Sequence, residues 1–278
     1  MTQRGAVFMG PVAVQIELPA ADTELLPGVR WGAMEAFPSA AYWTYQVMAH
    51  RAAGKPVRYR LGETLREEIA ACILGGHGIP AEVGVAAFRR VKESQILERD
   101  PSEEDILLQL REPLRVNGRS IRYRFARQKA RYLGAALRAL PETASGIRSG
   151  RELRDALLRL PGIGHKTASW ISRNWLDADD VAILDIHIVR AGRLVGFLAP
   201  ELSVPRDYLA LEAQFLAFSK AVGVRASELD AVIWREMASS SLTVRELLAA
   251  ANTDMLAAGS RRRAHVRRSH PNQRLLLD

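Results

Sequence analysis

The sequence contains a single cysteine, Cys72, among its 278 residues. One thiol cannot form an intramolecular disulfide, and it cannot supply the ligands of a cysteine-ligated metal cluster such as an iron–sulfur cluster. The chain also lacks any apolar run that approaches the roughly 20 residues needed to cross a bilayer. Its first residues lack the basic-then-apolar pattern of a signal peptide. We therefore expect an intracellular protein without membrane attachment, found in the cytoplasm or nucleoid if its source is bacterial.

Lysine is scarce too, because only 5 of the 39 basic residues are lysines, and the arginines are unevenly distributed. Residues 111–138 hold nine basic residues and one acid, and residues 260–278 hold six arginines and one acid, although the net charge of the chain is +8. Clustering of this kind suits a polyanion such as nucleic acid. A solvated basic face with a disordered tail is the alternative interpretation.

Apolar residues make up 48 % of the chain, which is enough for one large or two small hydrophobic cores. Residues 12–18, "VAVQIEL", alternate in polarity and predict a short strand. Elsewhere helical periodicity predicts helices over residues 40–50, 62–74, 80–93, 102–110, 122–140, 150–160, 165–175, 185–196, 205–222, 227–239 and 243–258. Ser102, with Asp105 three residues later, indicates a helix start. The predicted fold is mainly α, with at most a small N-terminal β element.

The stretch "LPGIGHKTA", residues 160–168, interrupts this helical pattern. Pro161 cannot continue the helix that precedes it, and Gly162 and Gly164 permit backbone angles that other residues avoid. The pattern predicts a helix, a tight hairpin and a second helix. The amides at the start of the second helix point outward unpaired, so they form an anion site that fits a DNA phosphate.

This hairpin, followed by "AILDIHI" at 182–188, resembles the helix-hairpin-helix DNA glycosylase superfamily. The separation of nineteen residues between the lysine and the aspartate is similar to that of its 8-oxoguanine DNA glycosylase branch. "QKARYLGAALRAL" at 128–140 and "LDAVIW" at 229–234 add to the resemblance, which covers residues 60 to 240 approximately. A hairpin alone is less specific, because such hairpins also occur in non-catalytic DNA-binding modules.

The resemblance implies that Lys166 is the catalytic nucleophile and that Asp185 is its catalytic partner. The first turn of a helix disfavours a further positive charge, and burial in a nucleotide pocket does the same, so both favour the free amine that attacks a sugar carbon. A simple phosphate contact is the alternative role for this lysine. Asp185 precedes a predicted helix and is expected to cap it with one oxygen, while the other stabilises positive charge that develops on the sugar.

The remaining site residues also follow from the resemblance. His187 matches a position that contacts DNA phosphate, and Gly162, Gly164 and His165 belong to the hairpin that binds DNA. The carbonyls of Leu158, Leu160 and Ile163 are implied to hold a monovalent cation, Na⁺ or K⁺. The loop "GGHGIP" at 75–80 lies where the family has its DNA wedge, so His77 or Ile79 is expected to fill the void that a flipped base leaves. An ordinary helix connection is the alternative for this loop.

Asp230 and Trp234 lie one helical turn apart and are expected to share a face. The simplest role for Trp234 is that of a core residue, whereas the family places an aromatic residue here against the flipped base. At position 230 the branch commonly has glutamine. A carboxylate accepts from both N1–H and the N2 amino group of guanine, so Asp230 still favours a guanine-type base.

The sequence thus predicts a two-lobed protein. One lobe, residues 60–175, ends in the helix-hairpin-helix; residues 1–59 and 176–258 form the second, and 259–278 form a basic disordered tail. The resemblance implies a bifunctional DNA glycosylase and AP lyase of base excision repair. It excises 8-oxoguanine from double-stranded DNA by base flipping, a lysine Schiff base and β-elimination. It is expected to act as a monomer, with no required cofactor and no iron–sulfur cluster. The alternatives are a glycosylase of this fold for another modified base and a non-catalytic DNA-binding protein.

Overall fold

The computed structural model describes residues 2–54, 60–76, 78–144, 146–240 and 242–250. It begins with an antiparallel hairpin of strands β1 (Gln3–Met9) and β2 (Val12–Leu18). A smaller pair, β3 (Glu24–Leu26) and β4 (Val29–Arg30), follows. The predicted strand over 12–18 is confirmed. Its alternation turns Ile16 and Leu18 inward, since both are buried.

The rest of the described chain is mainly helical, as predicted. The helices are α1 (Ala40–Ala52), α2 (Leu65–Leu74), α3 (Ala81–Glu93), α4 (Glu103–Arg111), α5 (Ala126–Thr143), α6 (Gly150–Leu157), α7 (His165–Leu176), α8 (Ile186–Val195), α9 (Tyr208–Val222) and α10 (Ala226–Ser239), with a 3₁₀ turn, η1 (Ile96–Glu98). The predicted start at Ser102 is confirmed, because Ser102 and Asp105 form a reciprocal capping box. Residues 242–250 are helical, whereas the rest of the predicted last helix and the predicted tail lie outside the described residues.

A second hairpin that the sequence reading missed lies between α4 and α5. Strands β5 (Leu114–Val116) and β6 (Arg119–Ile121) pair around Asn117 and Gly118, whose φ angles are 49° and 76°. Asn-Gly is the preferred pair for a two-residue turn with positive φ, so this dipeptide carried the missed signal. The helix predicted over 122–140 accordingly begins later, at Ala126.

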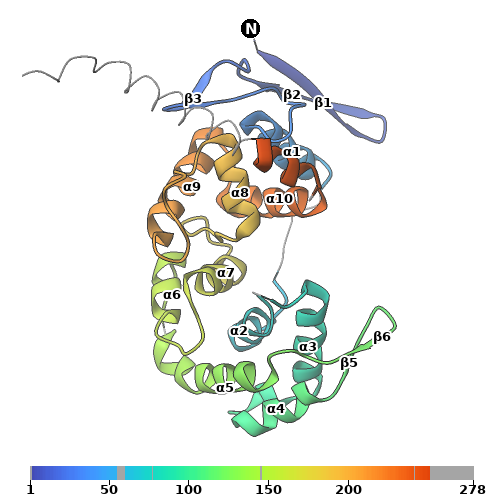
Figure 1. The fold of residues 1–278 in the computed structure, drawn as a ribbon, viewed down its shortest axis with the longest axis vertical. Helices are drawn as coiled ribbons and strands as arrows, with labels where there is room; N and C mark the ends of the chain where they lie inside the picture. Colours follow the sequence, from blue (N-terminus) through green and yellow to red (C-terminus); the bar gives the residue numbers. More distant parts are fainter. Residues whose placement is uncertain (1, 55–59, 77, 145, 241, 251–278) are drawn as a thin grey trace, which may run out of the picture.

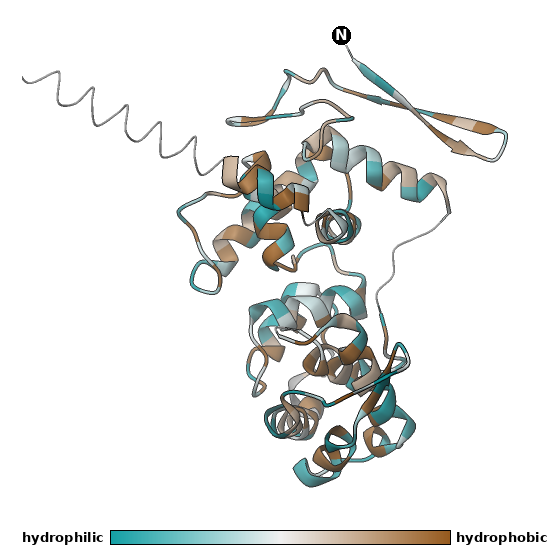
Figure 2. Ribbon diagram, turned by 45° about the vertical axis from the view of Figure 1, so that its right-hand side comes forward, coloured by the Kyte–Doolittle hydropathy of each residue, from teal (hydrophilic) through white to brown (hydrophobic). Residues whose placement is uncertain are grey.

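The helices form two groups, each around its own hydrophobic core (Figure 1). Buried side chains of α2 to α7 and β5 make the first core, which draws on residues 69–171. The second core draws on β2, α1 and the helices after residue 182. The chain therefore leaves the second group after α1 and returns to it at α8, and α7 lies between the two groups in Figure 1. Hydrophobic residues also reach the surface at the turn of the β1–β2 hairpin, where Phe8 and Val12 are exposed (Figure 2).

None of the helices in the described ranges is long and apolar enough to span a membrane.

Candidate active site

The sharp break after α6 has a specific cause in each of its two glycines. Gly162 has a φ of 78°, and a Cβ on it would lie 2.3 Å from the ring of Tyr132 in α5. The protein itself therefore requires glycine at this position. Gly164 is different, because it caps α7 with an extended backbone and a Cβ there would meet nothing within 4 Å. Because no other atom lies close to this position, the start of α7 is open to an approaching ligand.

Lys166 lies in the first turn of α7 and is partly buried. The residue before it, His165, stacks its ring on Tyr208 of α9, with 5.1 Å between ring centroids and 26° between planes. Tyr208 is only 3 % exposed. The stack holds the start of α7 against the second helix group, so the ring of His165 is used inside the protein. His165 is nevertheless partly exposed, and its contact with DNA stays a prediction.

Asp185 caps α8 as the sequence predicted. Its Oδ1 accepts hydrogen bonds from the amides of His187, at 2.8 Å, and Ile188, at 3.0 Å. Both bonds use the same oxygen, and Oδ2 receives no hydrogen bond from the part of the chain that the structure describes. One oxygen of this carboxylate therefore caps α8, and the described residues leave the other without a hydrogen bond.

Asp230 and Trp234 share a helix but differ in exposure. Asp230 is 4 % exposed, whereas Trp234 is 38 % exposed, so the core role considered for this tryptophan is wrong. Its neighbours in sequence, Val232 and Ile233, fill the core instead. The Trp234 ring lies edge-on to His187, with 6.3 Å between centroids. Trp234 and His187 thus meet at the surface beside the Asp185 cap.

The Asp230 carboxyl links the site electrostatically. Burial raises its pKa from 3.8 to about 6, and Asp185 adds to the rise. Arg173 of α7, whose Nη2 lies 3.7 Å from Oδ1 of Asp230, opposes the shift, as does Lys166. Asp185 and Lys166 therefore both act on Asp230, although the three residues come from three different helices or helix caps. Of the residues that the sequence singled out, Lys166 and Asp185 thus lie within electrostatic reach of Asp230, and His187 lies next to Trp234.

The raised pKa of Asp230 makes the stability of the protein depend on pH. The folded state keeps a proton that the unfolded state releases between about pH 4 and pH 6, so stability is lost as pH rises through this window. Two pKa units correspond to a change of about 3 kcal/mol in the free energy of unfolding.

We predict that Asp230→Asn, which cannot titrate, flattens this part of the pH profile of the unfolding free energy. Urea unfolding at several pH values measures it, and the exposed Asp22→Asn is the control. Parallel profiles for wild type and Asp230→Asn would contradict the prediction.

The loop between α2 and α3 contains the two residues that were predicted to act as the DNA wedge. Ile79 is 9 % exposed and belongs to the first core, so it is not free to fill a void in DNA, and that expectation is corrected. His77, the other candidate, lies outside the described residues.

The carbonyls that end α2 are held by Lys129, which donates to Ile73 at 2.6 Å and to Gly75 at 3.1 Å. Burial lowers the pKa of this lysine.

The carbonyls expected to hold a monovalent cation lie at the end of α6 and in the hairpin. The Leu160 carbonyl accepts the amide of Ile163 at 3.3 Å, and Leu158 caps α6. A carbonyl oxygen has a second lone pair, so the Leu160 bond leaves room for a cation. Among the described residues there is no group of three or more His, Cys, Asp and Glu side chains that would hold a metal ion.

Three buried residues near the site were missed from the sequence: Arg173, Tyr208 and Glu212. Arg173 lies seven residues after Lys166 and hence on the same helix face, which is a signal that was available. The other two come from α9, more than 40 residues away along the chain, and no local pattern connects them to Lys166.

Comparison with known proteins places the chain in a family. Residues 57–224 match the family model described as 8-oxoguanine DNA glycosylase. The chain belongs to this family. It is 28 % identical over 186 residues to the 8-oxoguanine DNA glycosylase/AP lyase of Methanocaldococcus jannaschii, and this covers 65 % of the chain and 83 % of the relative. The resemblance predicted from the hairpin and the aspartate is confirmed.

Solved structures of the family share the fold. The 8-oxoguanine DNA glycosylase of Thermotoga maritima matches with a TM-score of 0.53 and 25 % identity over 69 % of this chain and 94 % of that one. The Methanocaldococcus jannaschii enzyme in complex with a 15mer DNA containing 8-oxoguanine matches with a TM-score of 0.50 and 22 % identity, over 74 % and 94 % of the two chains. The second likeness is one of fold alone.

The range that matches the family includes some candidate residues and excludes others. Lys166 and Asp185 lie inside residues 57–224, and so do Tyr208 and Glu212. Asp230 and Trp234 lie beyond it, on α10. The candidates for catalysis are thus on the part of the chain that defines the family, whereas the candidates for base recognition are not.

Proposed function

We propose that this chain excises 8-oxoguanine from double-stranded DNA and cleaves the strand at the abasic site it creates. The observation that carries the proposal is the arrangement of Lys166 and Asp185 in a member of the 8-oxoguanine DNA glycosylase family. The Lys166 amine lies in the first turn of the helix that follows a DNA-binding hairpin. Asp185 has one oxygen that accepts no hydrogen bond from the described residues. Lys166 and Asp185 both interact electrostatically with the buried Asp230 side chain.

Lys166 supplies the nucleophile in this proposal. Its free amine attacks C1′ of the deoxyribose, the C1′–N9 bond breaks, and the base leaves with the bonding electrons and is protonated. The sugar ring opens to a Schiff base between Lys166 and C1′. Loss of a proton from C2′ then expels the 3′ phosphate by β-elimination. Water finally hydrolyses the Schiff base and releases Lys166.

Asp185 stabilises the charge that this reaction creates. Positive charge develops on the sugar as the base leaves, and a fixed carboxylate beside it lowers the energy of that transition state. The cap supports this role, because two amides hold Oδ1 and keep the side chain in one orientation. The same carboxylate receives the proton that Lys166 loses on attack.

DNA binding is assigned to the hairpin and to the surface beside it. The amides at Gly162, Gly164 and His165 lie at the turn and the start of α7, where backbone donors meet phosphate. His187 contacts phosphate through its ring, because its amide is bound by Asp185. The carbonyls of Leu158, Leu160 and Ile163 hold a Na⁺ or K⁺ ion that supports the hairpin. No organic cofactor or iron–sulfur cluster is needed, and one protein molecule suffices.

A basic surface adjoins the hairpin and supports duplex DNA as the partner. Tyr132, against which Gly162 packs, lies in α5 and within the basic segment 111–138. Six exposed arginines of this segment lie on β5, on β6, in the loop that follows β6 and in the first turns of α5: Arg115, Arg119, Arg122, Arg124, Arg127 and Arg131. Exposed positive side chains bind phosphates without regard to sequence.

Base recognition is assigned to Trp234 and Asp230. The exposed Trp234 ring stacks on the flipped base. The carboxylate of Asp230 lies close enough to Lys166 and Asp185 to interact with both, and its two oxygens carry several lone pairs that can accept hydrogen bonds. They accept from N1–H and the N2 amino group of an oxidised guanine.

This assignment predicts an order of substrates. We expect 8-oxoguanine to be excised well, 8-oxoadenine poorly, and 8-oxohypoxanthine at an intermediate rate, because its missing amino group costs about 1–3 kcal/mol. Asp230→Asn should narrow these differences, since an amide can also present a donor, and Asp230→Gln should keep 8-oxoguanine activity. The measurement is single-turnover excision of the three bases. Equal wild-type rates on all three would remove Asp230 from base recognition.

The function as a whole is tested by borohydride trapping. Wild-type protein incubated with borohydride and a duplex that contains 8-oxoguanine should form a covalent adduct, and an undamaged duplex of the same sequence should not. Binding without an adduct would instead indicate a non-catalytic DNA-binding protein. An adduct with a different lesion, but none with 8-oxoguanine, would indicate a glycosylase for another modified base.

A further inference from the structure

The backbone just before Asp185 is held by side chains rather than by secondary structure. Residues 182–184 belong to no helix or strand, so their amides need partners elsewhere. Two of these amides donate to buried side chains of α9, Ala182 to Glu212 at 3.0 Å and Leu184 to Tyr208 at 3.2 Å, and the Ile183 amide lowers the pKa of the buried Asp230 of α10. The Tyr208 hydroxyl also donates to the Ala182 carbonyl at 2.7 Å. These contacts hold the backbone of residues 182–184, which directly precede Asp185.

The same three side chains also contact α7, the helix that carries Lys166. Their partners on α7 follow at intervals of four residues: His165 stacks on Tyr208, the Ser169 hydroxyl donates to Glu212 at 3.4 Å, and Arg173 lies 3.7 Å from Asp230. Residues spaced by four lie on one face of a helix. We call Tyr208, Glu212 and Asp230 the α7 bridge, because each of them contacts one turn of α7, and Tyr208 and Glu212 each also bind one amide of residues 182–184.

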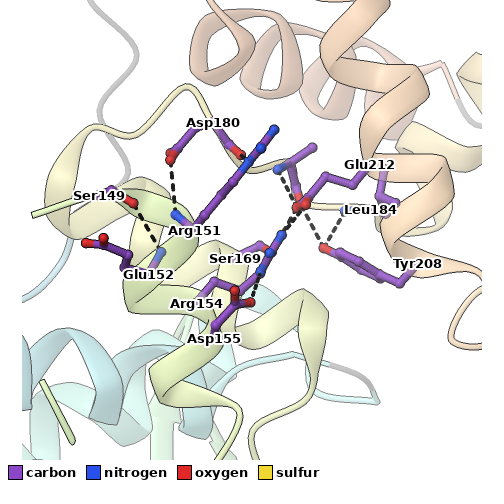
Figure 3. A network of polar contacts seen from close by, with 11 residues as sticks. Ser149, Arg151, Glu152, Arg154, Asp155, Ser169, Asp180, Leu184, Tyr208 and Glu212 are labelled. Atoms are coloured by element: carbon purple, nitrogen blue, oxygen red, sulfur yellow. Dashed lines mark hydrogen bonds and ion pairs between the residues drawn. The ribbon is translucent and has the colours of Figure 1, made fainter. Parts of the chain in front are cut away.

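Burial makes the α7 bridge a rigid connection. Its three residues are between 3 % and 4 % exposed. Glu212 also forms an ion pair with Arg154 of α6, whose side chain is equally buried, so both helices of the hairpin are attached to α9 (Figure 3). A buried ion pair gains little stability over apolar packing, but it tolerates few geometries. The arrangement therefore specifies a position more than it adds to the free energy of unfolding.

We propose that the α7 bridge positions Lys166 relative to Asp185, an inference that rests on the proposed function. Lys166 directly follows His165 at one end of the bridge, and Asp185 directly follows Leu184 at the other. One residue of a helix rises about 1.5 Å, so a slip of α7 by a single residue would break all three contacts. A misplacement of about 1 Å at the reacting atoms costs roughly 100-fold in rate. Tyr208 and Glu212 are thus positioning residues of the reaction.

Tyr208→Phe tests the proposal, because it keeps the ring that stacks on His165 but removes the hydroxyl that binds residues 182–184. The matched control is Tyr45→Phe, which removes a hydroxyl that donates to the Ala6 carbonyl at 2.8 Å, away from the site. We expect Tyr208→Phe to lower single-turnover excision of 8-oxoguanine by roughly 10- to 100-fold. Affinity for a duplex with a reduced abasic-site analogue should stay within about twofold, and the urea midpoints of both variants should shift alike.

Ser169→Ala tests the bridge from the side of α7. It removes the hydroxyl that donates to Glu212, and Ser172→Ala is its matched control on the same helix. Ser172 is fully buried, and its hydroxyl makes no hydrogen bond within the described ranges. We expect Ser169→Ala, unlike Ser172→Ala, to lower excision several-fold and to speed hydrogen exchange of the Ala182 and Leu184 amides, although the substitution lies on a different element.

The outcomes separate this inference from the proposed function. Wild-type protein that excises no lesion would overturn the function, while hydrogen exchange, which needs no activity, would still decide whether α7 is coupled to residues 182–184. An active wild type whose Tyr208→Phe and Ser169→Ala variants excise within twofold of their controls would overturn the positioning role. Unchanged exchange at Ala182 and Leu184 in Ser169→Ala would overturn the coupling.

Discussion

Replacing Lys166 by glutamine will abolish the covalent adduct that borohydride traps between the protein and DNA with 8-oxoguanine. Glutamine has nearly the same length but no nucleophilic nitrogen, so neither base excision through a Schiff base nor strand cleavage can proceed. We expect both rates to fall more than about 1,000-fold, while the affinity for lesion DNA changes little. Gel assays of trapping and of strand cleavage measure the effect, and binding to the same duplex is measured separately.

The chain offers a matched control for this substitution. Lys220→Gln also removes one lysine from the start or end of a helix, since Lys220 is exposed in the last turn of α9. We expect it to trap DNA like the wild type. If Lys166→Gln still formed the adduct at the wild-type rate, Lys166 would be only a phosphate contact, which was the alternative role for this residue.

Asp185→Asn will lose most of the excision rate and leave the fold intact. The asparagine Oδ1 can still accept the amides of His187 and Ile188, so the cap is kept, but the charge that stabilises the developing sugar cation is gone. We expect excision to fall by about 100- to 1,000-fold, which is typical for loss of one group that stabilises transition-state charge. The affinity for DNA should change much less.

Asp185→Ala separates the two roles of this carboxylate. Alanine removes the cap as well as the charge, so the free energy of unfolding should fall by about 1 kcal/mol relative to Asp185→Asn. Single-turnover excision and urea unfolding of both variants make the comparison. Excision by Asp185→Asn at the wild-type rate would show that Asp185 serves only as the cap of α8.

The α-helical architecture was predictable because the apolar residues repeat with the period of a helix. Ten predicted helices, from 40–50 to 227–239, correspond to α1 to α10. Start signals at Ser102 and Asp185 were also readable, since a side chain that caps a helix acts on amides two or three residues away. The helix predicted over 122–140 begins four residues too early, because "RYRF" at 122–125 continues the apolar pattern of α5 backward.

The exposure of individual side chains was not predictable in the same way. Trp234 lies among apolar neighbours in sequence, and only the packing of α10 leaves it at the surface while Leu229 and Ile233 are buried. Ile79 follows a glycine-rich loop, and only the position of that loop over the first core buries it. Helical periodicity identifies a face of a helix, but which edge of that face stays open depends on the neighbouring helix.

The sequence by itself determined the helices, the hairpin and the candidates Lys166 and Asp185, because each is set by residues within a turn or two of one another. Only the tertiary structure decided how these two residues are held. Tyr208, Glu212 and Asp230 are distant from Lys166 in the chain, and their pairing with α7 and with residues 182–184 depends on how α9 and α10 pack. The pKa of Asp230, raised to about 6, has the same origin, since burial and neighbouring charges exist only in the folded chain.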